Sequence, residues 1–135
     1  MAVKVLTNAS ITINSIDLSS KSNSVTLNYE VDSVEVTAFG DGGHKFTGGL
    51  QNNSIEVALM QDFASALTEA TIYPLVGTTT TVVIKADSAA TALTNPTYTI
   101  TGAYLAAHTP VAGGIGELMM TTLSFTGGTL VKTTS

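Results

Sequence analysis

Cysteine, tryptophan and arginine are all absent from this 135-residue chain. Without cysteine the chain can form no disulfide, no thiolate metal site and no cysteine nucleophile. All five basic residues are lysines, and ten acidic residues outnumber them to give a formal net charge of −5. An acidic chain without arginine cannot build the guanidinium-rich phosphate contacts of a specific nucleic-acid binder.

Long apolar runs are absent as well. Because no run of 18 or more apolar residues occurs, we expect no membrane-spanning segment and no membrane partner. The first five residues lack the apolar core of a signal peptide, so we expect no secretory leader. Only 11% of the residues are charged, against about 25% in typical soluble domains. Threonine and serine are abundant instead, and such a hydroxyl-rich surface is natural for a subunit covered mostly by copies of itself.

The sequence is rich in alternation of apolar and polar residues with a period of two. The pattern runs through 25–31 and 55–59, with shorter stretches at 11–13, 34–36 and 82–84. Such alternation is typical of strands with one buried face and one wet face, and threonine suits a pleated surface. We therefore predict a mainly β fold, an antiparallel β-sandwich or partly closed barrel, with residues 1–135 as a single domain.

One stretch, 63–76, breaks the alternation and carries apolar residues at helical spacing. Asp62 before it is a suitable N-cap, and Gly77 after it is a suitable C-terminal stop. Because Pro74 forbids a long regular helix, the pattern predicts one short flanking α-helix within 63–76. Two further stretches, 87–95 and 101–115, are predicted to be loops.

No motif in the sequence predicts catalysis. His44 and His108 each lie beside turn residues, and a catalytic histidine would need a nucleophile or carboxylate partner within hydrogen-bond reach. Asp41 near His44 could form such a pair, but a solvated turn is the better explanation. The glycine run 113–116 lacks the Lys-Ser/Thr pair and the following helix of a phosphate-binding loop. We therefore expect that the chain is not an enzyme and uses no cofactor.

Three carboxylates, those of Glu30, Asp32 and Glu35, lie within six residues of one another. Such a cluster could hold calcium or perform acid–base chemistry. However, Glu30 and Asp32 alternate with apolar residues, which favours a position on the solvent-exposed face of a strand. We therefore expect no metal site.

An ordered series of short motifs covers residues 8–63. It contains Asp17-Leu18-Ser19, then Val34-Glu35-Val36-Thr37-Ala38-Phe39-Gly40, then Gly48-Gly49-Leu50 followed by the alternating stretch 54–57, with a weaker return at 117–131. In order and spacing, this series resembles the tail tube (major tail) proteins of long-tailed bacteriophages, particularly those that infect actinobacteria. Each motif is short, so the resemblance rests on their order.

The resemblance implies a small β-sandwich with one flanking helix, six copies of which form a ring, and rings that stack into a hollow tail tube. It implies as partners other copies of the chain, the tape-measure, tail terminator and baseplate or tip proteins, and double-stranded DNA that passes without specific binding. The expected location is the virion tail, assembled in the host cytoplasm, with a role in genome ejection.

A conduit for DNA must not hold DNA, and an acidic lumen repels phosphates. Six copies at full ionisation would carry about −30 per ring. Glu30, Asp32 and Glu35 have the tightest spacing of the carboxylates, and we expect them to face the lumen.

Two alternatives remain open. A capsid decoration or minor tail protein of a phage could share the same fold, because a fold alone does not fix a role. A carbohydrate- or host-binding β-sandwich module would need a concave aromatic platform, and the chain has only four tyrosines and four phenylalanines.

Overall fold

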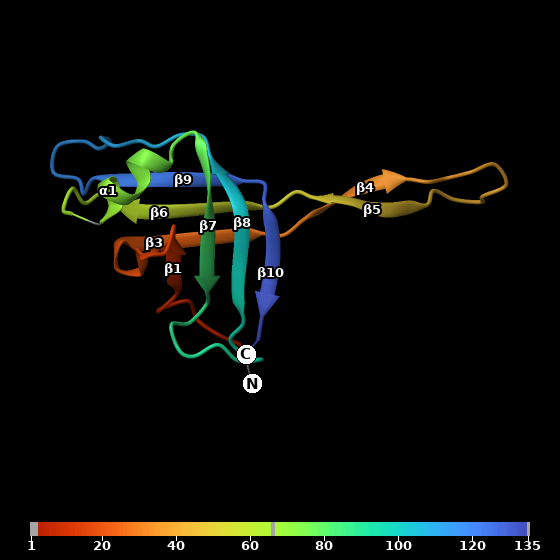
Figure 1. Cartoon of the computed structure of the whole chain (residues 1–135), viewed down its shortest axis with the longest axis horizontal. Coiled ribbons are helices and arrows are strands. Elements are labelled where there is room, and N and C mark those ends of the chain that lie inside the picture. Colours follow the sequence, from red (N-terminus) through yellow and green to blue (C-terminus); the bar gives the residue numbers. More distant parts are fainter. Residues whose placement is uncertain (1–2, 66, 135) are drawn as a thin grey trace.

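Two crossing layers of strands form the body of the computed structural model, which describes residues 3–65 and 67–134 (Figure 1). Every strand pair in it is antiparallel, as predicted. The first layer contains β2 (Ile16–Asp17), β1 (Ser10–Ile13), β7 (Thr78–Lys85), β8 (Thr97–Leu105) and β10 (Thr129–Thr133). The second contains β9 (Met120–Thr126), β6 (Ser54–Met60) and β3 (Ser22–Asn28). Because β2 and β3 lie at opposite ends of the strand order, the described sheet does not close into a barrel and the fold is a β-sandwich.

The two layers are joined where β8 turns a corner. The first part of β8 pairs with β10, whereas Tyr104 and Leu105 at its end pair with β9. Gly102 lies between these two parts with φ of +81°, a conformation that favours glycine. One strand therefore belongs to both layers, an arrangement found where orthogonal sheets share a corner.

The core lies between the layers and confirms most of the alternation pattern. The inward side chains of β6 and β7 are buried, and those of Val57 and Val82 are completely buried. Val25 and Leu27 are only partly buried because β3 lies at the edge of the described sheet, where it pairs with β6 alone. The buried apolar residues are Ile11, Ile13, Leu18, Ile55, Val57, Leu59, Ile72, Leu75, Val82, Ile84, Ile100, Ala103, Leu105, Leu123 and Phe125.

The predicted short helix is present as α1 (Thr68–Ile72), which continues into the 3-10 turn η2 (Tyr73–Leu75). Pro74 lies at the start of η2, consistent with its restriction of a longer helix. Gly77 follows with φ of +82° and ends the segment as predicted. The prediction of Asp62 as the N-cap was wrong: Leu67 precedes α1 and makes no side-chain cap, while Asp62 accepts a hydrogen bond from the Ala64 amide at 2.9 Å.

The predicted loop 87–95 is confirmed, but the loop predicted for 101–115 begins later. β8 continues through Gly102 to Leu105, because a single glycine bends this strand without ending it. A second 3-10 turn, η1 (Ser19–Lys21), connects β2 to β3. Within the described ranges, the helices are too short and too polar to span a membrane.

Candidate assembly surfaces

A two-stranded arm, residues 29–52, extends from the ends of β3 and β6 well beyond the sandwich (Figure 1). It is formed by β4 (Val31–Glu35) and β5 (Phe46–Gln51), which among the described strands pair only with each other. Isolated hairpins are marginally stable in water and need a third strand or a packed face. The large apolar side chains of the arm are nevertheless exposed: Tyr29, Val31, Val34, Val36, Phe39, Phe46 and Leu50.

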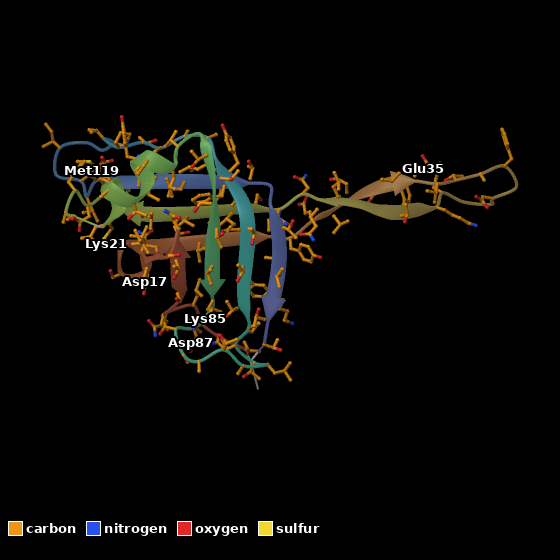
Figure 2. The ribbon with its side chains drawn as sticks, in the orientation of Figure 1. Asp17, Lys21, Glu35, Lys85, Asp87 and Met119 are labelled. Carbon is orange, nitrogen blue, oxygen red and sulfur yellow. The ribbon has the colours of Figure 1, made fainter. Side chains whose placement is uncertain are left out.

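The tip of the arm, residues 36–45, is held in shape by its own polar contacts. Glu35 accepts a hydrogen bond from the Thr37 hydroxyl at 2.8 Å and pairs with His44 (Figure 2). Asp41 accepts from the Ala38 amide at 2.7 Å and pairs with Lys45 at 3.0 Å. The hydrogen bonds of Glu35 with His44 and Thr37 keep the pKa of its carboxyl below its ordinary value. The contacts of Asp41 with Ala38 and Lys45 likewise lower its pKa.

Phe39 is the most exposed of the large apolar residues of this tip. Its side chain is fully exposed, at 110% of the reference area. Aromatic residues, phenylalanine included, are enriched in protein–protein interfaces relative to the rest of the surface. The tip therefore has the form of a contact element.

The three acidic residues predicted from the sequence all lie on this arm. Glu30 is at its base, where its backbone carbonyl accepts from the Asn52 amide at 2.7 Å and its carboxylate accepts from Asn28 at 2.8 Å. Asp32 is exposed on β4, and Glu35 ends β4 beside the tip. The three carboxylates are thus distributed along the arm, and their exposure to a lumen stays a prediction.

A second surface, which we call the polar face, is the outer side of β3, β6 and β9. In its central row Thr26 pairs with Glu56, and Glu56 pairs with Ser124. Cross-strand partners share one face of a sheet, so the rows above and below join it. The polar face comprises Ser24, Thr26, Asn28, Ser54, Glu56, Ala58, Thr122, Ser124 and Thr126. Glu56 carries the single charge of this set.

The polar face could not be predicted from the sequence, because alternation indicates which residues share one face of a strand but does not indicate which strands are neighbours. The signal was nonetheless present, since serine, threonine or glutamate occupies most positions between the buried residues of these strands.

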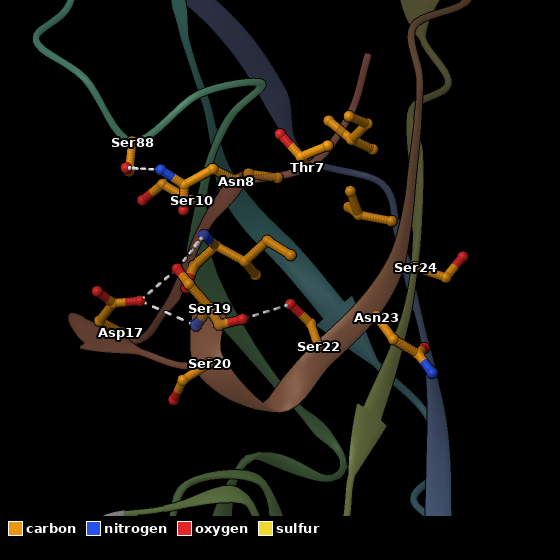
Figure 3. Close-up of a pocket in the computed structure, with 14 residues that line it drawn as sticks. Thr7, Asn8, Ser10, Asp17, Ser19, Ser20, Ser22, Asn23, Ser24 and Ser88 are labelled. Atoms are coloured by element: carbon orange, nitrogen blue, oxygen red, sulfur yellow. Dashed lines mark hydrogen bonds between the residues drawn. The ribbon is translucent and has the colours of Figure 1, made fainter.

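The open side of the sandwich, beside the free edge of β3, contains two adjoining hollows. One, of about 500 Å³, is lined mostly by hydroxyl and amide side chains (Figure 3). In it the Ser19 hydroxyl and amide both donate to Asp17 and lower the pKa of that carboxyl. The other, of about 450 Å³, is apolar and includes Leu27, Tyr98 and Leu130. We call this apolar hollow the mouth.

The two histidines lie on separate elements of the described structure, and Asp41 pairs with Lys45. His44 is on the exposed tip, paired with Glu35. His108 lies partly buried in the connection between β8 and β9, where burial lowers its pKa and the nearby Glu69 carboxylate opposes that shift. In the glycine run, the Gly114 amide donates to Glu117 at 3.2 Å, which closes a local turn.

No protein-family model matches the sequence, and a search of curated proteins gives no match. The fold, in contrast, has several solved counterparts. A chain of the sheath–tube complex of an extracellular contractile injection system in its extended state has a TM-score of 0.70 at 11% identity, over 98% of this chain and 92% of that one. The tube-terminating cap of the anti-feeding prophage has a TM-score of 0.70 at 12% identity, over 100% and 95%. A chain of the native gene transfer agent virion has a TM-score of 0.67 at 14% identity, over 97% and 99%.

The chain therefore has the tail tube fold that is shared by components of contractile injection systems and of gene transfer agent particles. At these identities the likeness establishes the fold. The narrower resemblance to tail proteins of phages that infect actinobacteria finds no support among these structures.

Proposed function

We propose that this chain is a structural, non-enzymatic subunit of a phage-like tail tube that assembles into stacked hexameric rings. The observation that carries the proposal is the arm, which displays apolar side chains on a two-stranded hairpin without covering them within its own chain. A hairpin of this kind is stabilised when copies assemble around it. The match of the body to tube and terminator components over nearly the whole chain agrees with this role.

The polar face supports a conduit for DNA. Its serine and threonine hydroxyls offer no fixed positive charge to phosphates, and Glu56 repels them. A ring of six copies with this face turned inward would carry six Glu56 carboxylates around the channel. Glu30, Asp32 and Glu35 on the arm would extend the acidic lining between rings.

The proposed partners are other copies of the chain and the tape-measure, terminator and baseplate or tip proteins of the same tail. The proposed location is the virion, after assembly in the host cytoplasm. Double-stranded DNA would pass through the tube without being bound.

Electron microscopy of the purified full chain tests the proposal. We expect rings with sixfold symmetry, or tubes formed from them, as protein concentration rises. A monodisperse monomer in sedimentation velocity at every concentration up to the solubility limit would refute self-assembly. A ring of another symmetry would refute the hexamer and leave the assembly role intact.

A further inference from the structure

The arm joins the sandwich at a place where both of its strands are interrupted. Residues 29–30 on one strand and 52–53 on the other separate the β3–β6 ladder of the sandwich from the β4–β5 ladder of the arm. We call these four residues the hinge. A backbone hydrogen bond crosses it, from the Asn52 amide to the Glu30 carbonyl at 2.7 Å. The direction of the arm therefore depends on what else holds the hinge.

Within the hinge, Asn53 is buried, with 1% of its surface exposed. Its side-chain amide donates to the Gln51 side-chain carbonyl at 2.9 Å and to the Gly128 carbonyl at 3.2 Å. Its side-chain oxygen accepts from the Glu30 amide at 3.4 Å. Because a buried amide is costly to leave unpaired, these contacts hold Asn53 in one position. One side chain thus joins both strands of the hinge to the turn between β9 and β10.

Gln51, the last residue of β5, extends this connection into the first layer. Its side-chain carbonyl also accepts from the Leu130 amide of β10 at 2.9 Å. Within the described sheet β10 pairs with β8 alone, so this hydrogen bond occupies a donor on the other edge of β10. The arm is therefore attached to the second layer through its own strands, and to the first layer through two side-chain amides.

We propose that Asn53 and Gln51 form a clamp that fixes the direction of the arm relative to the sandwich and couples it to the edge of β10. This inference concerns the single chain and goes beyond the proposed assembly. Without the clamp the arm swings at the hinge, while the β4–β5 ladder and the core stay folded. At 3.3 Å per residue, Gly42 in the tip lies up to about 36 Å from the hinge, so a swing of about 20° moves it by roughly 12 Å.

A distance between two labels on one chain measures the direction of the arm. The chain lacks cysteine, so two introduced cysteines can carry nitroxide labels in a dilute, monomeric sample. Gly42→Cys labels the tip, where a side chain meets open space, and Thr133→Cys labels the exposed end of β10. Because β10 runs across the axis of the arm (Figure 1), this distance changes when the arm swings. We expect a narrow distance distribution by double electron–electron resonance while the clamp is intact.

Two substitutions of matched shape test the chemistry of the clamp. Asn53→Asp replaces the donating amide by a carboxylate that faces the oxygens of Gln51 and Gly128, so we expect the clamp to open. Gln51→Glu keeps an oxygen that accepts from Asn53 and Leu130, so the distribution should stay narrow. Opening should widen the distribution by roughly 10 Å, close to the displacement of the tip in a swing of about 20°.

A second variant opens the clamp without a buried charge. Gln51 is only half-buried, so Gln51→Ala should stay folded by circular dichroism and widen the distribution as Asn53→Asp does. Asn28→Ala is the matched control: Asn28 borders the hinge, but its amide donates to the exposed Glu30 carboxylate. A broad distribution with the clamp intact, no widening in Gln51→Ala, or equal widening in Gln51→Glu or Asn28→Ala would each overturn the proposal.

Amide hydrogen exchange at Leu130 tests the coupling to β10. Gln51→Ala should accelerate this exchange about five- to tenfold, as expected for the loss of one hydrogen bond, while the β6–β9 ladder keeps its rates. Equal rates at Leu130 with and without Gln51 would refute the coupling. Both measurements use the monomer, so their failure leaves the proposed function intact, and a failure to assemble leaves the clamp intact.

Discussion

The turn between β9 and β10 consists of two glycines, Gly127 and Gly128, that differ in the space around their Cα atoms. Gly127 and Gly128 have φ values of +78° and +88°, and an alanine in such a conformation costs about 1–2 kcal/mol. A Cβ atom at Gly127 would meet open space, with no atom within 4 Å. A Cβ atom at Gly128 would lie 2.7 Å from the Thr101 carbonyl oxygen and 2.8 Å from Cγ2 of the buried Ile100.

We therefore expect Gly127→Ala to lower the free energy of unfolding by about 1–2 kcal/mol and Gly128→Ala by about 2–5 kcal/mol. The additional loss is the cost of overpacking, about 1–3 kcal/mol. Relaxation by backbone movement is restricted, because β10 is paired with β8 from Thr129 onward and Asn53 donates to the Gly128 carbonyl at 3.2 Å.

Urea unfolding followed by far-ultraviolet circular dichroism measures this difference. The protein must be dilute enough to remain monomeric, since assembly adds its own stability. With a slope of about 1–3 kcal/mol/M for a small domain, Gly128→Ala should reduce the midpoint by about 0.7 M or more and clearly further than Gly127→Ala. Equal reductions in the two variants would refute the close approach of the turn to β8.

Three further predictions concern the assembly surfaces. Phe39→Ala should leave the free energy of unfolding within about 0.5 kcal/mol of the parent but abolish tube formation by electron microscopy; normal tubes would refute its role as an anchor. The pKa values of Glu35 and Asp41 are lowered in the folded tip, so their stabilisation is present above the ordinary carboxyl pKa of about 4 and is lost as the pH falls through the lower folded values. Amide hydrogen exchange in 36–45 should accelerate selectively in that acidic window, relative to the sandwich, once corrected for the intrinsic pH dependence. Glu56→Lys should make assembled tubes retain double-stranded DNA at low salt, whereas Glu117→Lys, outside the polar face, should not; equal retention by both would contradict an inward polar face.

The strands of the sandwich could be predicted from the sequence because their burial follows local alternation. Ile55, Val57 and Leu59 alternate in the sequence and are buried in the structure. Val34 and Val36 alternate equally well and are exposed, because no described element covers the arm as a second layer. Alternation therefore predicts a strand and its two faces, and the topology decides whether the apolar face is covered.

The candidate surfaces were less predictable for a related reason. Glu56 belongs to the polar face because Thr26 and Ser124 are its neighbours across the sheet, and both are distant from it in the sequence. The mouth likewise combines residues of β3, β7, β8 and β10. The sequence showed the acidic residues of the arm, but their position relative to the lysines depends on strand order, which periodicity does not determine.

The arm is a direct extension of β3 and β6, and this continuity has a mechanical consequence. A force applied at the tip would pass along β6 into its ladder with β9, a ladder of seven residue pairs whose two strands lie along the direction of the pull (Figure 1). The hydrogen bonds of such a ladder are loaded together in shear, instead of being opened one after another as in peeling. A subunit held by its arm could therefore bear tension along the arm axis without unravelling from the point of attachment.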